Sequence, residues 1–327
     1  MNMQQGKVSI VLCTYNGERY LHKQLDSLLQ QTYPIFEIII QDDHSQDGTF
    51  TILEEYAHDH DNIKLFQNES AHGVNGNFFS AMRKATGDFI AISDQDDIWE
   101  AGKIEKQIDA IGNKLLCGGH SRPFSEDGAF VHFEERHPNT NLIRLLFITS
   151  IPGHTMLMRR ELLEIIPFDD TTSLPSSYDF YFEMTAAAYN SIAYVDGVLV
   201  NQRRHVEAVS YIDYSHNLRS WQNGLYILRW SVRHYKEIKP YMRHCMSTIK
   251  LLLDSLDSKE PILKEAKKIV NAELEDGLGA YLRLTMLFVK HHSRLFQTSG
   301  GSFTKLCRAL LYPIMQMYNY RYFLKAK

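Results

Sequence analysis

Three carboxylates follow a short apolar run in this chain, and their spacing points most directly to chemistry. The run Phe89–Ile92 is typical of a buried strand, and Asp94, Asp96 and Asp97 come directly after it. Desolvating one carboxylate costs free energy, and three carboxylates close together repel one another. A divalent cation with hard oxygen ligands would neutralise such a cluster, and a phosphate group could bind on its other side. The sequence therefore predicts a metal site at the end of this strand.

The segments that must position these carboxylates alternate between strands and helices. Apolar and β-branched runs predict strands at 7–14, 36–40, 63–66 and 89–92. Apolar residues at helical spacing predict helices at 18–31, 49–58, 75–86 and 103–111. This alternation predicts an α/β fold, with a mostly parallel sheet and helices on both faces.

Polar clusters follow three of the predicted strands. They are Thr14–Asn16 after the first strand, Asp42 and Asp43 after the second, and Asp94–Asp97 after the fourth. The carboxyl ends of parallel strands lie at one edge of a sheet, where ligands of such folds bind. We therefore expect the three clusters to meet in one site.

The remainder of the chain changes from irregular to helical. Residues 112–150 give an irregular signal with one strand-like stretch at 129–133. Further on, the pattern predicts helices at 161–165 and 176–190 and a strand at 192–200. From about residue 214 every segment is predicted to be helical, in three stretches at 215–253, 260–292 and 303–323.

Composition argues against a zinc site, a disulfide framework, a signal peptide and a transmembrane helix. Apolar residues make up 44% of the 327 residues, enough for a substantial core. The four cysteines form no CxxC pair, which argues against a zinc site or a disulfide framework and suits a reducing cytoplasm. The first residues lack the apolar region of a signal peptide, and no run of 18 apolar residues predicts a transmembrane helix.

Charge divides the chain into two parts. Residues 1–202 hold 14 Lys and Arg and 29 Asp and Glu. Residues 203–327 hold 21 Lys and Arg and 10 Asp and Glu. The basic part could face anionic lipid or a phosphate-bearing acceptor. A solvated helical face is the alternative interpretation.

Six ordered motifs resemble those of the family 2 glycosyltransferases, which have the GT-A fold. The motifs lie at 8–16, 40–49, 87–97, 153–160, 178–179 and 203–205. The resemblance covers about residues 7–210 and gives no guidance beyond them. The Ser-Asp-Gln-Asp-Asp-Ile-Trp and Gly-His-Thr-Met-Leu forms look most like bacterial polysaccharide enzymes, including rhamnosyltransferase-like members.

The resemblance implies a domain organisation and a reaction. A GT-A domain over 1–212 would have a donor half at 1–111 and an acceptor half at 112–212, followed by an all-helical C-terminal extension at 213–327. The implied reaction is an inverting, metal-dependent sugar transfer in cell-surface polysaccharide synthesis. The donor would be a UDP- or dTDP-sugar, the acceptor a saccharide or lipid-linked saccharide, and no nucleic acid is expected.

The resemblance also assigns the metal ligands, with Mg²⁺ or Mn²⁺ as the ion. Asp94 and Asp96 would form the family's DxD motif, with Asp96 as the direct ligand and Asp94 at the ribose or the metal. Asp97 is a further candidate. His205 would complete the metal site or contact the diphosphate, and the alternative is an ordinary histidine at a strand end.

The resemblance also implies a second set of residues, which would bind the donor. It comprises Thr14, Tyr15, Asn16, Asp42, Asp43, Asn77 and Asp94. Asp42 would accept a hydrogen bond from the base, with Asp43 structural, and Tyr15 would stack on the base. The alternative for the Asp42-Asp43 pair is turn capping with Ser45 and Asp47.

The resemblance implies that Asp179 is the general base, a role in which a carboxylate at the acceptor hydroxyl takes its proton. The alternative is a helix cap, since Ser176 and Asp179 have the spacing of a capping box. In the family the preceding residue is usually Glu or His, whereas here it is Tyr178. Gly153, His154 and Tyr178 are expected on the acceptor side.

Two other functions stay open at this stage. A non-catalytic nucleotide- or carbohydrate-binding module would not need both Asp96 and Asp179. A sugar-phosphate nucleotidyltransferase would carry a glycine-rich basic loop after the first strand, where this chain has Thr14-Tyr-Asn-Gly17.

The basic, aromatic C-terminal segment suits several partners equally. A membrane surface, an ordinary helical subdomain and a homodimer interface all fit its composition. The expected location is cytoplasmic, with peripheral attachment to the inner face of the plasma membrane left open.

Overall fold

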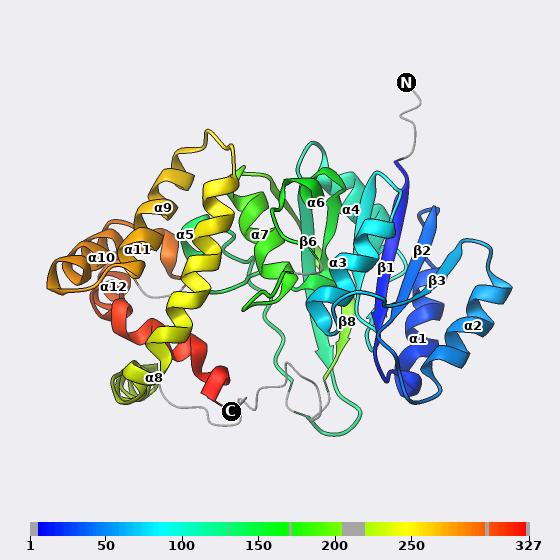
Figure 1. Ribbon diagram of the computed structural model, residues 1–327, viewed down its shortest axis with the longest axis horizontal. Helices are drawn as coiled ribbons and strands as arrows, with labels where there is room; N and C mark the ends of the chain where they lie inside the picture. Colours follow the sequence, from blue (N-terminus) through cyan, green and yellow to red (C-terminus); the bar gives the residue numbers. More distant parts are fainter. Residues whose placement is uncertain (1–5, 130, 170–171, 205–219, 298–300, 325–327) are drawn as a thin grey trace. The chain divides into compact units, whose positions relative to one another are not determined.

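A computed structural model describes this chain over residues 6–129, 131–169, 172–204, 220–297 and 301–324 (Figure 1). The chain divides into two compact units. Unit 1 comprises residues 1–137, 151–182 and 191–214, and unit 2 comprises residues 138–150, 183–190 and 215–327. The expected domain boundary at 212/213 falls outside the described residues and stays a prediction.

Unit 1 is built on one eight-stranded sheet, in the order β3-β2-β1-β4-β7-β6-β8-β5. Its strands are β1 (Val8–Thr14), β2 (Glu37–Asp42), β3 (Ile63–Gln67), β4 (Phe89–Ser93), β5 (Ile98–Trp99), β6 (Leu116–Phe124), β7 (Leu157–Arg159) and β8 (Ile192–Arg203). Its helices are α1 (Glu18–Leu29), α2 (Thr49–Asp59), α3 (Val74–Lys84), α4 (Lys103–Ile111), η1 (Gly153–Thr155) and α6 (Glu161–Ile165). α7 (Tyr178–Ala188) contributes residues to both units.

The pairing of the strands confirms the predicted α/β class. β1 pairs in parallel with both β2 and β4, β2 with β3, and β6 with β8. The three pairs β4–β7, β6–β7 and β5–β8 are antiparallel. The first four strands were predicted correctly because each is rich in apolar residues, and every residue of β1, β2 and β4 is buried, as in strands covered on both faces.

Helices on both faces bury the central strands. Every residue of β1, β2 and β4 is buried. Alternate side chains of β1, such as Ile10 and Leu12, join one core cluster with residues of α1 and α4. Helix α3 packs against β1 and β2 and buries Phe79 and Met82. The parallel register pairs Thr14 with Asp42, so β1 and β2 end at the same edge of the sheet.

Strand β6 was not predicted, because its glycines and proline indicated an irregular segment. A Cβ on Gly118 would lie 2.5 Å from Ile151 Cγ2, and a Cβ on Gly119 would lie 2.3 Å from Leu199 Cδ1. The glycines therefore allow side chains to approach the strand closely, a known use of glycine within sheets. The predicted strand at 129–133 was wrong, since the described residues of this range form no strand.

Unit 2 is helical in its described residues. It contains α5 (Leu142–Leu145), α8 (Ser220–Ser255), α9 (Pro261–Leu274), α10 (Leu278–Lys290), α11 (His292–Leu295), α12 (Ser302–Met315) and η2 (Gln316–Leu324). The predicted helix 260–292 is interrupted at Gly277, whose φ of +98° is favourable only for glycine. Among the described residues, no helix has both the length and the apolar character needed to cross a membrane.

A buried acid in unit 2 gives a test of pH-dependent stability. Burial raises the pKa of Glu273 to about 7, although the Gln316 amide, which donates to its carboxylate at 2.5 Å, opposes the rise. A raised carboxyl pKa means that the folded chain is most stable below the unfolded pKa and loses stability as the pH rises towards 7. We expect Glu273→Gln to raise the free energy of unfolding by up to about 3 kcal/mol at pH 8, and to change it little at pH 4.

Thermal unfolding at the two pH values checks this expectation. The exposed Glu237→Gln on α8 serves as the control variant. A variant that is equally destabilised at both pH values would show that the Glu273 carboxylate is accommodated in its charged form.

Candidate active site

The acidic segment between β4 and β5 is held at its end by Arg203, the last residue of β8. The backbone N–H of Arg203 donates to Asp97 Oδ1 at 3.0 Å, and its Nε donates to the Asp96 carbonyl at 3.0 Å. Asp97 is only 2% exposed. Its other oxygen, Oδ2, is buried without a hydrogen-bond partner among the described residues. Such an atom is costly to bury unless a proton or a cation satisfies it.

His154 completes this cluster from η1. Its Nδ1 lies 3.4 Å from Asp94 Oδ2 and 3.5 Å from Asp97 Oδ2. One ligand atom from each of the three residues lies within 4.8 Å of the others. The opposite ring nitrogen, Nε2, lies 2.8 Å from Ser121 Oγ, a contact that orients the ring. Two carboxylates and one imidazole are all metal-ligand groups, so these residues fit a divalent cation, and the imidazole suits a transition metal ion such as Mn²⁺ better than Mg²⁺.

The three groups perturb one another strongly. Burial raises the pKa of Asp97 to about 7, and the neighbouring Asp94 and Asp96 charges add to the rise, whereas His154 opposes it. Burial alone would lower the pKa of His154, but the adjacent Asp97 and Asp94 carboxylates raise it. A negative cluster of this kind binds a positive charge, whether a proton on His154 or a metal ion.

The structure groups His154 with the acidic residues, although the sequence predicted it on the acceptor side. Asp96, the predicted direct ligand, is outside this group of three. His205, the other predicted ligand, lies outside the described residues. Arg203 belongs to the motif at 203–205 and was assigned no separate role from the sequence. It is buried, stacks between Tyr20 and Phe124 at 4.7 Å from each ring, and pairs with Glu126 at 2.6 Å.

Gln95 joins the acidic segment to the loop after β1. Its Oε1 accepts from the Tyr15 N–H at 2.8 Å, and its Nε2 donates to the Tyr15 carbonyl at 3.0 Å. A Cβ on Gly17 would lie 2.4 Å from Gln95 Oε1, so the loop approaches this side chain closely. The side chain of Tyr15 itself is 56% exposed. Sequence reasoning missed Gln95, because a glutamine among aspartates carries no signal of its own.

Asp179 contacts the same loop that carries His154. Its Oδ2 accepts from the Gly153 N–H at 3.2 Å and its Oδ1 from the Phe180 N–H at 2.9 Å. Burial raises the pKa of Asp179, and the Asp94 charge adds to the rise, although hydrogen bonds to Ser177, Phe180 and Gly153 oppose it. A carboxyl with a raised pKa is a stronger base once it is ionised.

The start of α7 is positioned by Asn75, which lies near the beginning of α3. Asn75 Oδ1 accepts from the Tyr178 N–H at 2.8 Å, and its Nδ2 donates to the Ser176 carbonyl at 2.9 Å. Asn75 therefore ties α3 to the segment that carries Asp179. The helix begins at Tyr178, which places Asp179 in its first turn. No sequence pattern indicated that Asn75 has this role.

Asp42 is held within its own turn. It is fully buried, and it accepts hydrogen bonds from Thr14 Oγ1 at 2.8 Å, from the Ser45 N–H at 2.8 Å and from Ser45 Oγ at 2.5 Å. Of the two interpretations made from the sequence, this geometry favours turn capping with Ser45. Asn16, in the neighbouring loop, donates its N–H to Ser45 Oγ at 2.9 Å. Thr14 and Asn16 thus fix the Asp42 turn to the end of β1.

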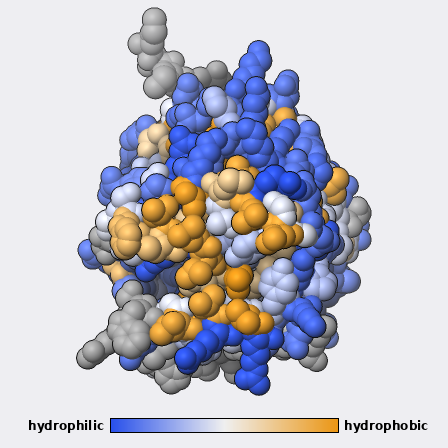
Figure 2. Space-filling view, turned by 90° about the vertical axis from the view of Figure 1, so that its left-hand side faces the viewer, coloured by the Kyte–Doolittle hydropathy of each residue, from blue (hydrophilic) through white to orange (hydrophobic). Residues whose placement is uncertain are grey.

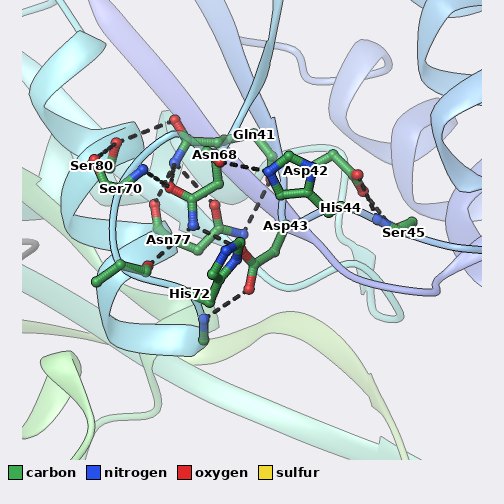
Figure 3. Close-up of polar contacts among 12 residues, drawn as sticks. Gln41, Asp42, Asp43, His44, Ser45, Asn68, Ser70, His72, Asn77 and Ser80 are labelled. Carbon is green, nitrogen blue, oxygen red and sulfur yellow. Dashed lines mark hydrogen bonds and ion pairs between the residues drawn. The ribbon is translucent and has the colours of Figure 1, made fainter.

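Asp43 organises the segment that precedes α3, as Figure 3 shows. Its Oδ1 accepts from Asn68 Nδ2 at 2.7 Å and lies 2.9 Å from His72 Nδ1, and its Oδ2 accepts from the Gly73 N–H at 2.7 Å. Burial would raise the pKa of Asp43, but these hydrogen bonds and His72 lower it overall. The His72 side chain is 70% exposed, so the cluster reaches solvent.

Asn77 was predicted to bind the donor, and its amide is engaged within the protein. It is buried, its Oδ1 accepts from Gln41 Nε2 at 3.0 Å, and its Nδ2 donates to the Gln41 carbonyl at 3.3 Å (Figure 3). These bonds tie α3 to β2. In this conformation Asn77 supports the loops around Asp42 and Asp43.

A buried lysine and glutamine on α4 stabilise the backbone next to the metal-ligand candidates. Gln107 Nε2 donates to the carbonyls of Thr155 at 2.7 Å and Cys117 at 3.0 Å. Lys103 Nζ donates to Gln107 Oε1 at 2.8 Å and lies 3.8 Å from the centroid of the Trp99 ring. Burial lowers the pKa of Lys103 to about 7. Thr155 adjoins His154, so α4 fixes the segment that presents the imidazole.

Comparisons with known proteins find similar sequences and similar folds. Residues 9–166 match the model of Glycosyl transferase family 2. WfgD of Escherichia coli, a UDP-Glc:alpha-D-GlcNAc-diphosphoundecaprenol beta-1,3-glucosyltransferase, is 43% identical over 102 residues, which are 31% of this chain. The match spans 39% of the length of WfgD, so the chain covers about two fifths of that relative.

Solved structures show the same fold over nearly the whole chain. Staphylococcus aureus TarS 1–349, in complex with UDP-GlcNAc, has a TM-score of 0.56 at 18% identity, covering 98% of this chain and 92% of TarS. The mannosyltransferase PcManGT of Pyrobaculum calidifontis, in complex with GDP-Man and Mn²⁺, has a TM-score of 0.52 at 18% identity, covering 99% of this chain and 87% of that one. The fold is therefore that of the GT-A glycosyltransferases, and residues 9–166 match the model of Glycosyl transferase family 2.

The contact between Gly153 and α7 gives a test of how the site is positioned. A Cβ on residue 153 would lie 2.7 Å from Tyr178 Oη and 3.3 Å from Asp179 Cβ. We expect Gly153→Ala to displace these side chains, to destabilise the fold by about 1–3 kcal/mol and to lower turnover by about 10- to 100-fold. Thermal unfolding and transfer assays measure the two effects.

Gly224→Ala is the matched control, since nothing lies within 4 Å of the Cβ it would add. Wild-type stability and turnover in Gly153→Ala would mean that the loop and α7 are not closely coupled.

Proposed function

We propose that this chain is an inverting glycosyltransferase that moves a sugar from a nucleotide-sugar donor to a hydroxyl of a saccharide or lipid-linked saccharide acceptor. One observation carries the proposal. The carboxylates of Asp94 and Asp97 and the His154 imidazole converge at the carboxyl end of β4, and the backbone of Gly153 joins that loop to Asp179. This chemistry requires stabilisation of a nucleoside diphosphate leaving group and a general base, and the arrangement supports the proposal of both roles.

Asp179 is the proposed general base. As the acceptor oxygen forms its bond to the anomeric carbon, the bond from that carbon to the diphosphate breaks, and Asp179 takes the hydroxyl proton. A single displacement of this kind inverts the anomeric centre. The raised pKa of Asp179 favours proton transfer, and the hydrogen bonds from Gly153 and Phe180 fix the direction of the carboxylate.

Asp94, Asp97 and His154 are the proposed ligands of a divalent cation, with Asp96 as a further candidate. When bound there, Mg²⁺ or Mn²⁺ would stabilise the negative charge that develops on the departing diphosphate. The buried Oδ2 of Asp97 supports this assignment, because a cation would replace the hydrogen bond it lacks. Independent support comes from PcManGT, which was solved in complex with GDP-Man and Mn²⁺.

The donor and acceptor are proposed from the comparisons. The loops at Thr14–Asn16 and Asp42–Asp43 would receive the nucleotide, with the exposed Tyr15 ring available for stacking on the base. A UDP- or dTDP-sugar is the proposed donor, since TarS was solved with UDP-GlcNAc. A polyprenyl-linked acceptor is proposed because the name of WfgD specifies one.

Replacing the proposed base tests the reaction. Asp179→Asn removes the proton acceptor but keeps the shape of the side chain, so we expect transfer to fall by about 10²- to 10⁴-fold while donor binding is retained. Initial-rate assays and calorimetry of nucleoside diphosphate binding measure the two effects, with the exposed Asp109→Asn as the control. Near-normal transfer by Asp179→Asn would show that Asp179 is not the general base.

The identity of the metal ligands can be tested without turnover. We expect Asp97→Asn and His154→Gln each to weaken Mn²⁺ binding by at least about tenfold, with a smaller effect of Asp96→Asn. Titration of the protein with Mn²⁺, followed by electron paramagnetic resonance, measures affinity directly. A larger loss of Mn²⁺ affinity in Asp96→Asn than in Asp97→Asn and His154→Gln would identify Asp96 as the direct ligand.

A non-catalytic nucleotide- or carbohydrate-binding module is the alternative function. Such a module would bind a nucleoside diphosphate without transferring sugar to any acceptor. Single-turnover assays with UDP- and dTDP-sugars distinguish the two, because an enzyme of this class releases the nucleoside diphosphate when it transfers or slowly hydrolyses the sugar.

A further inference from the structure

Helix α10 of unit 2 is apolar on two opposite sides. Ala280, Leu284 and Phe288 are buried. Leu278, Leu282 and Met286 are exposed by 75%, 51% and 63%, and their spacing of four residues places them on one side of the helix. A helix at the surface of a soluble domain normally has polar side chains on its outer side. The exposed side of α10 is therefore unusual.

Helix α12, which packs against α10, repeats this pattern. Ala309 and Pro313 are buried, whereas Phe303, Leu310 and Leu311 are exposed by 78%, 49% and 44%. These six exposed side chains, three on each helix, are called the apolar stripe below. Figure 2 shows the face of the helical unit, where apolar side chains gather in a broad band with hydrophilic side chains above and below it.

The segment that carries the apolar stripe holds charge of one sign only. Residues 277–327 contain no Asp or Glu, although the chain has 39 of them, and contain eight Lys and Arg. Arg283 and Lys290 pair with Glu275 and Glu265, which lie outside this segment. Arg294, Lys305 and Arg308 make no ion pair with any described residue. Their charges are thus available to a partner.

Apolar side chains in a segment whose charges are all positive suit an anionic lipid surface better than a second copy of the chain. A symmetric dimer through the same face would bring the cationic segments of both copies together, with no acidic residue from 277–327 to offset them. An anionic leaflet attracts the cations and accepts apolar side chains at the boundary between headgroups and acyl chains.

We propose that the apolar stripe of α10 and α12 binds the chain to the surface of an anionic bilayer. Leu278, Leu282, Met286, Phe303, Leu310 and Leu311 enter the headgroup region, and Arg294, Lys305 and Arg308 contact lipid phosphates. The proposal concerns unit 2 alone and does not depend on the proposed transfer activity.

Vesicle flotation tests this proposal with the full-length chain. We expect binding to vesicles of phosphatidylcholine with about one third phosphatidylglycerol at about 50 mM NaCl, release at about 500 mM NaCl, and little binding to pure phosphatidylcholine vesicles. Leu282→Asp and Met286→Asp should each lower the bound fraction by at least about fivefold, because each places a negative charge among the apolar side chains.

Phe36→Asp is the matched control, since it introduces the same negative charge at an exposed apolar residue of unit 1. It should retain binding to the anionic vesicles. Absence of binding at low salt, or equal loss in Phe36→Asp and Leu282→Asp, would overturn the proposal. A dimer in solution that Leu282→Asp dissociates, without lipid binding by the wild type, would assign the apolar stripe to a second copy instead.

Discussion

A carboxylate oxygen that is buried without a hydrogen bond is the constraint on which the site in unit 1 depends. Asp97 Oδ2 faces the His154 ring at 3.5 Å, and the other oxygen of the same carboxylate is fixed by the Arg203 N–H. An isolated ion in this position would be strongly unfavourable, which is why the pKa of Asp97 is raised to about 7. The buried oxygen at the end of this strand would be satisfied by a proton or by a cation. A bound cation would favour the ionised form of the carboxylate, as any opposite charge close by does.

Polar side chains that bind backbone groups keep this arrangement rigid. Gln95 holds the loop after β1, Gln107 holds the carbonyl next to His154, and Asn75 holds the start of α7. Each is an amide side chain that satisfies backbone groups which would otherwise be unpaired. Networks of this kind fix the geometry of a site more than they add to stability, since each bond replaces one to water. The candidate ligands and the candidate base are thus positioned by residues that do no chemistry.

Sequence patterns predicted the sheet well because strand formation here is a local property. The segments that became β1, β2, β3 and β4 are rich in apolar residues, and their carboxyl ends had to share an edge once they were parallel. Contacts between distant segments could not be predicted in this way. The position of His154 beside Asp94 and Asp97 follows from the antiparallel pairing of β4 with β7, which no periodicity reveals. Likewise, Gly118 and Gly119 indicated a loop, because the side chains of Ile151 and Leu199 that need their space are remote in sequence.

The unequal distribution of charge along the chain has the same physical consequence in its acidic and its basic part, because an excess of one sign favours a counter-charge from outside. Residues 1–202 carry 29 acidic residues against 14 basic ones, and a donor with a diphosphate would be repelled by such a surface. The acidic residues nearest the candidate site are the ones that a cation would neutralise, so bound metal would turn a repulsive region into an attractive one. In residues 277–327 the excess has the opposite sign, and again nothing within the segment balances it. An excess of one charge on a folded surface lowers its stability unless a counter-charge arrives from outside. In unit 1 the ligand set fits a small cation, whereas in unit 2 the exposed apolar side chains beside the cations fit an extended anionic surface.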